Sequence, residues 1–180
     1  MSLKDHTSPL VDFATRIEGD KRIDGLADAI APVADELVAD SQSRDLLQGA
    51  WLGHSVHPLL TDLPIGAWTS ANMLDLFGGA TSRPAARKLI FVGLLTAVPT
   101  VLTGLAEYST TSGGDRRVGV VHALANGTAF GLFAASWQAR RKERHKLGAT
   151  LALAGTSVAT VGRYLGGHLA IARKVGTGLR

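Results

Sequence analysis

The chain has 180 residues, of which 46% are apolar types and only 19% are charged, whereas an average soluble protein has about 25% charged residues. This composition excludes a disordered chain. Cysteine is absent, which excludes disulfide frameworks, thiolate zinc sites and cysteine-held iron–sulfur clusters. The formal net charge of +4 is compatible with nucleic-acid binding only if the basic residues form a continuous face.

The charges are divided unevenly along the chain. Residues 1–57 contain ten acidic and five basic residues, for a net charge of −5, whereas residues 58–180 contain five acidic and fourteen basic residues, for a net charge of +9. In the second part the basic residues form short runs between long apolar stretches. This pattern is typical of membrane proteins, so we expect the lipid bilayer and not a nucleic acid as partner.

Residues 1–50 predict an acidic, amphipathic helical segment. Apolar side chains recur at helical spacing from Asp12 to Leu47, with acidic residues between them. No basic stretch followed by an apolar one occurs at the start, so we expect no cleaved signal peptide. Because anionic lipid headgroups repel an acidic face, we expect this segment to pack against the rest of the protein.

Residues 51–180 contain four apolar segments joined by short connections. The segments cover residues 58–77, 89–106, 118–137 and 147–172. Each is close to the 20 or so residues that cross a hydrocarbon layer of about 30 Å. A soluble bundle would show a polar stripe along each helix, and the second and third segments show none. We therefore expect an all-α fold, an antiparallel four-helix transmembrane bundle, in a multi-pass protein of the cell membrane with both termini on the same side.

An antiparallel arrangement brings several ionisable residues to one face of the membrane. These residues are His54, His57, Asp62, Glu107, His122 and His168. Ionisable groups at membrane depth are costly and usually face the bundle interior, so the cluster is a candidate functional site. The alternative is that these histidines cap helices and hydrogen-bond one another.

Imidazoles and carboxylates without thiolates suit zinc, iron or copper, or a haem b held by two histidines on facing helices. The candidate metal ligands are His54, His57, His122, His168, Glu107 and Asp62. The candidate haem-binding residues are His57, His122 and His168 as axial ligands, Arg117 and Arg163 as partners of the propionates, and Tyr164 and Asn126 as side chains that orient a histidine. Such a site favours electron transfer or redox sensing.

Two other functions remain open. The same polar cluster suits a small membrane transporter or an ion- or proton-binding protein. The acidic N-terminal helices suit a structural anchor that assembles a partner protein. The sequence contains no classical nucleophile pair, so we expect no catalytic residue, and the chain is also compatible with a homo-oligomer.

The residues of this candidate site lie in motifs that resemble those of a known family. The first motif, residues 51–70, reads WLGHSVHPLLTDLPIGAWTS, and TGLAE (103–107), RVG and HALAN (117–126) and LGGHL (165–169) follow in order. Together they resemble a bacterial family of predicted four-helix membrane proteins, classed as a domain of unknown function. Members of that family occur fused to or beside Rieske iron–sulfur domains, which implies electron transfer. Because this chain has no cysteine, the resemblance implies a separate Rieske-type or other redox partner.

Overall fold

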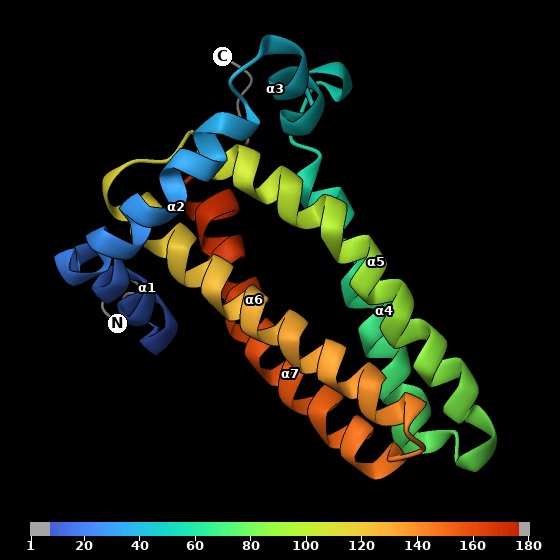
Figure 1. Cartoon of the computed structure of the whole chain (residues 1–180). Helices are drawn as coiled ribbons and strands as arrows, with labels where there is room; N and C mark the ends of the chain where they lie inside the picture. Colours follow the sequence, from blue (N-terminus) through green and yellow to red (C-terminus); the bar gives the residue numbers. More distant parts are fainter. Residues whose placement is uncertain (1–7, 177–180) are drawn as a thin grey trace, which may run out of the picture.

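The computed structural model describes residues 8–176, which form an all-α protein without β-strands (Figure 1). The α-helices of this part are α1 (Pro9–Gly19), α2 (Asp24–Leu37), α3 (Ser41–Gln48), α4 (His57–Phe77), α5 (Arg83–Tyr108), α6 (Gly113–Arg141) and α7 (His145–Gly167). A short π-helix, η5 (His168–Ala172), continues α7. The all-α class expected from the sequence is confirmed.

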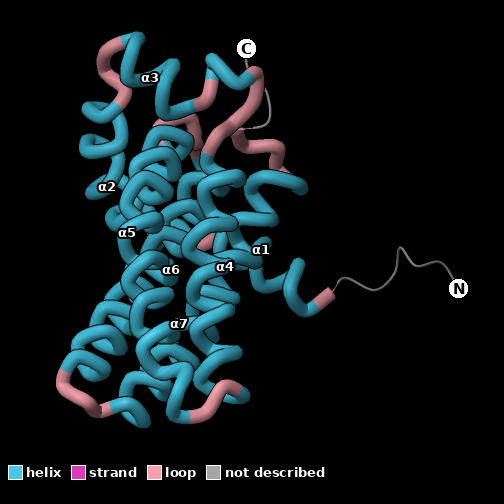
Figure 2. Tube along the Cα trace, turned by 90° about the vertical axis from the view of Figure 1, so that its right-hand side faces the viewer, coloured by secondary structure: helices cyan, strands magenta, loops and turns pink. Residues whose placement is uncertain are grey.

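The first three helices form a layer on one end of the long helices. Side-chain caps explain where α1 and α3 begin: the Ser8 hydroxyl accepts a hydrogen bond from the backbone N–H of Leu10, and the Asp40 carboxylate accepts one from that of Ser43. Helix α1 packs on α6, α2 on α5 and α6, and α3 on α5. Figure 2 shows α2 and α3 beside the ends of the long helices. The acidic N-terminal segment therefore packs against the bundle.

The four long helices form two close pairs. Helix α4 packs along α5, and α6 packs along α7; α5 also contacts α6, and α4 contacts α7 (Figure 1). Short connections make consecutive helices antiparallel. Helices α4 and α6 consequently lie diagonally across the bundle and run in the same direction, which brings the beginnings of both helices to the end that α2 and α3 cover.

Two of the four helices are long and apolar enough to cross a membrane. In the described part of the chain these are Ala80–Tyr108, which includes α5, and Gly113–Arg141, which is α6, with mean hydropathies of 2.1 and 1.5. Helices α4 and α7 are not among these candidates. The expectation of four spans is thus supported for α5 and α6, and for α4 and α7 it stays a prediction.

The main apolar core fills the half of the bundle that is farther from α1–α3. Trp68 of α4 stacks on Phe133 of α6, with ring centroids 4.0 Å apart. The buried residues around them are Ala71, Ala86, Ile90, Leu94, Ala97, Ala129 and Ala152. Beyond this core the buried guanidinium of Arg140 forms an ion pair with Asp75, and its Nη1 lies 2.8 Å from Asp75 Oδ1. Two smaller apolar clusters lie beneath α1 and α2.

Candidate functional site

Two of the predicted site histidines lie together inside the bundle. His57 is the first residue of α4, and His122 lies in the third turn of α6. Their ring centroids are 6.5 Å apart, and the ring planes are inclined by 77°. Because α4 and α6 lie diagonally, the two imidazoles approach each other across the centre of the bundle.

Each imidazole is oriented by a backbone carbonyl of the neighbouring helix. His57 Nδ1 lies 2.9 Å from the carbonyl oxygen of Thr100 in α5, and His122 Nδ1 lies 2.8 Å from that of Gly162 in α7. A carbonyl oxygen can only accept a hydrogen bond, so Nδ1 carries the proton in both rings. The Nε2 atom of each neutral ring therefore holds a lone pair, the form in which histidine binds a metal.

A glycine lies against each ring. A Cβ atom added to Gly104 of α5 would come within 2.8 Å of His57 Cε1, and one added to Gly166 of α7 would come within 2.8 Å of His122 Cε1. Real Cβ atoms do not approach other atoms so closely, so any other residue at either position would displace the imidazole. Both glycines lie in the family motifs TGLAE and LGGHL, but neither was among the predicted site residues, because glycine has no polar side chain. The spacing of four residues from Thr100 to Gly104 and from Gly162 to Gly166 is the signal that could have found them.

Other polar groups distinguish the two rings. The Thr103 hydroxyl lies 3.2 Å from His57 Nδ1. The Asn126 amide nitrogen lies 3.0 Å from His122 Nε2, to which it donates a hydrogen bond. Within residues 8–176, no hydrogen-bond partner lies at His57 Nε2. Asn126 thus orients His122, as expected, but a metal at His122 Nε2 would have to displace its amide.

The other predicted metal ligands do not join this pair. His168 Nε2 lies 2.7 Å from a carboxylate oxygen of Glu18 in α1, so His168 connects η5 to the N-terminal layer. His54 is exposed in the turn before α4, and its Nδ1 lies 2.9 Å from the carbonyl of Ser55. Asp62 is exposed on the outer face of α4. Residues 8–176 contain no group of three His, Asp or Glu side chains that could hold a metal ion, so the expected six-residue ligand set is not assembled.

Glu107 occupies a separate, partly buried position near the end of α5. Its carboxylate accepts a hydrogen bond from the Ser55 hydroxyl, and a Cβ atom added to Gly176 would lie 3.0 Å from the carboxylate carbon. Thr103 precedes Glu107 by one helical turn and contacts His57. Glu107 therefore lies beside the histidine pair along α5 and is not a ligand in the same cluster.

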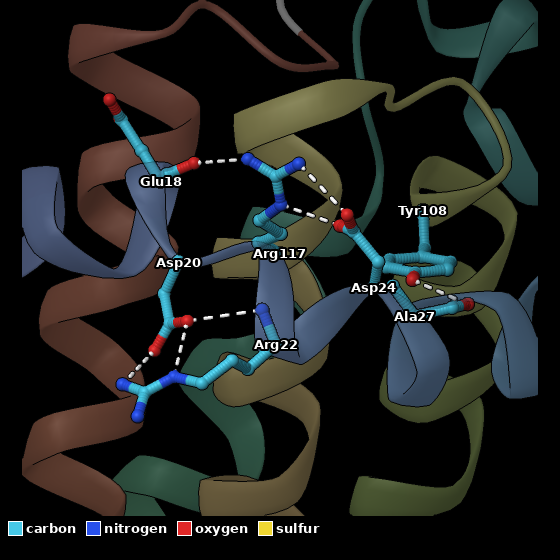
Figure 3. A network of polar contacts seen from close by, with 7 residues as sticks. All are labelled: Glu18, Asp20, Arg22, Asp24, Ala27, Tyr108 and Arg117. Carbon is cyan, nitrogen blue, oxygen red and sulfur yellow. Dashed lines mark hydrogen bonds and ion pairs between the residues drawn. The ribbon is translucent and has the colours of Figure 1, made fainter.

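Arg117 holds the N-terminal layer on the bundle (Figure 3). Its Nε lies 2.6 Å from Asp24 Oδ1 of α2, and its Nη1 donates to the carbonyl oxygen of Glu18 at 2.6 Å. The guanidinium lowers the pKa of Asp24 through these hydrogen bonds. In the same network, Arg22 lowers the pKa of Asp20 to about 2. Arg117 is thus engaged with two N-terminal helices and does not face the histidine pair.

Arg163 and Tyr164 lie on the outer side of α7. They line an open, mostly apolar cavity of about 540 Å³ together with Thr160, Gly167, His168, Ile171 and Ala172. Tyr164 is thereby near His168, as its helical spacing predicts, but the partner of His168 is Glu18 and not His57. Arg163 directly follows Gly162, whose carbonyl orients His122.

A known protein family matches the part of the chain that forms the four long helices. The family described as "Predicted membrane protein (DUF2231)" matches residues 53–178. The chain belongs to this family. The DUF2231 match includes α4–α7 and thus every residue of the histidine pair and its surroundings, whereas α1–α3 precede it. A search of curated proteins and a search of solved structures found no match.

The DUF2231 description confirms the family resemblance expected from the sequence and identifies a predicted membrane protein. It gives no activity and no cofactor. It does not bear on the association with Rieske domains, which stays a prediction.

Proposed function

We propose that this DUF2231 protein is a multi-pass membrane protein that binds one haem b between His57 and His122, for electron transfer or redox sensing. The observation that carries the proposal is the pair of neighbouring imidazoles, whose ring centroids are 6.5 Å apart and whose Nδ1 atoms are both bonded to backbone carbonyls. A bound haem supplies a one-electron couple. The protein supplies two neutral Nε2 ligands and an interior from which water is largely excluded.

The distance between the rings fits this role. A metal ion that binds two facing imidazoles through Nε2, with bonds of about 2 Å, separates the ring centroids by about 6 Å. The hydrogen bond from Nδ1–H to a carbonyl fixes the tautomer and increases the basicity of the ligating nitrogen. Asn126 would have to turn away from His122 Nε2, which requires rotation of a single side chain.

The donor set favours haem over a bare metal ion. Two histidines are the complete axial set of a haem, whereas a protein site for zinc or copper normally uses three or four side-chain ligands. Residues 8–176 provide no such group of three. Arg163, which follows Gly162 in α7, is the candidate partner for a propionate, because Arg117 is already paired with Asp24.

The distribution of side chains supports four crossings of the membrane. Large apolar residues are exposed on every long helix, including Leu59 and Leu63 of α4, Leu95 and Val98 of α5, Leu124 of α6, and Leu153 and Val161 of α7. Polar residues lie inside, where Asn72, Ser136 and Arg140 are buried. An apolar exterior around a partly polar interior is the arrangement expected of helices in lipid.

A spectrum of detergent-purified protein, expressed with sufficient haem, tests the cofactor. We expect a Soret band, one haem per chain, and loss of the haem in both His57→Ala and His122→Ala. His54→Ala and His145→Ala are matched controls and should retain it, because neither ring faces the pair. A folded protein without a Soret band, or full occupancy in the double variant of His57 and His122, would reject the proposal. Stoichiometric metal without haem would favour a bare ion instead.

A second candidate is proton or cation transfer through the same interior. It is favoured by Glu107, a partly buried carboxylate that accepts a hydrogen bond from Ser55 and lies one turn from Thr103. Proteoliposomes containing the wild type should then conduct protons, and Glu107→Gln should reduce the flux. Equal flux in Glu107→Gln and wild type would exclude this function.

A further inference from the structure

Three contacts across the bundle join residues that are equally far apart in the sequence. His57 contacts His122, Trp68 stacks on Phe133, and Asp75 pairs with Arg140. Asp75 and Arg140 are 65 residues apart, and the partners in the other two contacts are separated by the same interval. Along α4 the contacts follow one another after about three turns and then about two. Each of these three residues of α4 therefore contacts the residue of α6 that lies at the same interval along the chain.

Helices α5 and α7 repeat each other in the same way. Gly93 lies against the Trp68 ring and Gly155 against the Phe133 ring, just as Gly104 lies against His57 and Gly166 against His122. Gly93 and Gly155 are separated by the same number of residues in the sequence as Gly104 and Gly166. The same interval separates Thr100 from Gly162, whose carbonyls accept from the two imidazoles. Each large ring of one hairpin thus has a counterpart in the other with the same neighbours.

The amino-acid sequence carries the same repeat. The interval between the two histidines aligns H-x-L-x6-G-x-W (57–68) with H-x-L-x6-G-x-F (122–133). The interval between the paired glycines aligns L-x3-G-x3-A-x6-G (89–104) with the identical pattern at 151–166. The second interval is three residues shorter than the first. The first hairpin has these three additional residues between Asp75 and Leu89, around its turn. An antiparallel four-helix bundle is roughly two-fold by its topology alone, but the topology does not require the same residue types at constant intervals.

We infer that the bundle is an internal duplication, in which hairpins α4–α5 and α6–α7 form one two-fold ligand site at the centre of the bundle. Each hairpin contributes an imidazole, the carbonyl that fixes its tautomer and the glycine against which the ring lies. Gly104 and Gly166 are accordingly positioning residues, and they are equivalent. Binding of the ligand by both Nε2 atoms rests on the proposed haem function. The equivalence of the two hairpins does not depend on that function.

Several of the differences between the two hairpins lie around the two rings. Asn126, which donates to His122, corresponds to Thr61 in the first hairpin, and Thr103, which contacts His57, corresponds to Leu165. Glu107 corresponds to Leu169. The two halves share the groups that orient the rings but differ in the other polar side chains near them.

Nitrogen-15 NMR of histidine in the haem-free protein tests the inference. We expect the Nδ1–H tautomer for both His57 and His122. We also expect that Gly104→Ala perturbs the signals of His57 and that Gly166→Ala perturbs those of His122. If haem binds, each variant should weaken it by roughly tenfold or more. The matched controls are Gly66→Ala and Gly131→Ala, an equivalent pair with nothing within 4 Å of an added Cβ, and both rings should be unchanged in them.

If Gly104→Ala or Gly166→Ala unfolds the protein, a double variant tests the same contact between glycine and ring. Removal of the ring removes the clash, so His57→Ala with Gly104→Ala should unfold at the same temperature as His57→Ala alone, and the same holds for His122 with Gly166. Perturbed ring signals without haem binding would reject only the haem. Ring signals that respond to one glycine and not to the other, or to neither, would overturn the equivalence.

Discussion

The two halves of the bundle interior are built differently, although the same four helices form both. The half around Trp68 and Phe133 is filled by apolar side chains and is followed by a buried ion pair. At the level of His57 and His122, two glycines, one hydroxyl and one amide lie against the two rings. We therefore expect the first half to provide most of the stability and the second half to hold the proposed ligand. A rigid half can thereby position the site without contacting it.

The largest effect should come from breaking the buried ion pair. Arg140→Met leaves the Asp75 carboxylate without its partner inside the protein, which should lower the free energy of unfolding by about 3–5 kcal/mol. Chemical unfolding in detergent measures this loss. The charge-exchanged double variant, Asp75→Arg with Arg140→Asp, should recover part of it. If Arg140→Met has the stability of the wild type, the ion pair does not hold this half together.

A smaller loss is expected where a side chain is added to the packed half. A Cβ atom at Gly155 would lie 3.1 Å from Phe133 Cε2, so Gly155→Val should destabilise the protein by about 1–3 kcal/mol through overpacking. Gly131→Val, on the same bundle but with open space around its added Cβ, is the control and should change stability less. Haem bound per folded molecule should be unaffected by either change.

Thr103→Val separates orientation from stability in the histidine half. Valine has the shape of threonine without the hydroxyl, so the cost should be only about 1 kcal/mol. The Thr100 carbonyl remains to hold His57 Nδ1–H, so the ring should keep its tautomer in the NMR spectrum. A change of tautomer in this variant would show that the hydroxyl, rather than the carbonyl, orients the ring.

The smallest effect concerns the contact between the N-terminal layer and the bundle. Because Arg117 lowers the pKa of Asp24 in the folded protein from its ordinary value of 3.8, the ion pair stabilises the layer fully above about pH 4 and is lost as the pH falls through the lowered pKa. Hydrogen-exchange protection of α2 amides should therefore decrease between pH 6 and pH 3. In Asp24→Asn, protection should be lower at pH 6 and change less with pH; an unchanged pH dependence would contradict this assignment.

Helical spacing predicted part of the site and could have predicted more. The sequence predicts that His57 and His122 lie close together, because both are near the beginnings of helices that start at the same face of the bundle. Asp62 follows His57 by five residues, which turns it to another side of the helix, and the structure exposes it. The repeated motifs of the two hairpins, and the constant intervals between them, are also visible in the sequence alone.

Contacts with the N-terminal layer could not be predicted from spacing. His168 meets Glu18, and Arg117 meets Asp24, across 150 and 93 residues of chain. Nothing in the neighbourhood of His168 distinguishes a ligand from a partner of a distant carboxylate. Only the packing of α1 and α2 on the bundle determines those partners.

The parallel course of α4 and α6 has an evolutionary consequence. Copies of a hairpin that run in the same direction are related by an axis along the bundle, so if the bundle spans the membrane as proposed, neither copy needs inverted insertion. A single ancestral hairpin could have formed a symmetric homodimer with one imidazole from each subunit. Fusion of two such genes would then have allowed the two copies to diverge in sequence, so that one acquired an amide beside its ring and the other a hydroxyl.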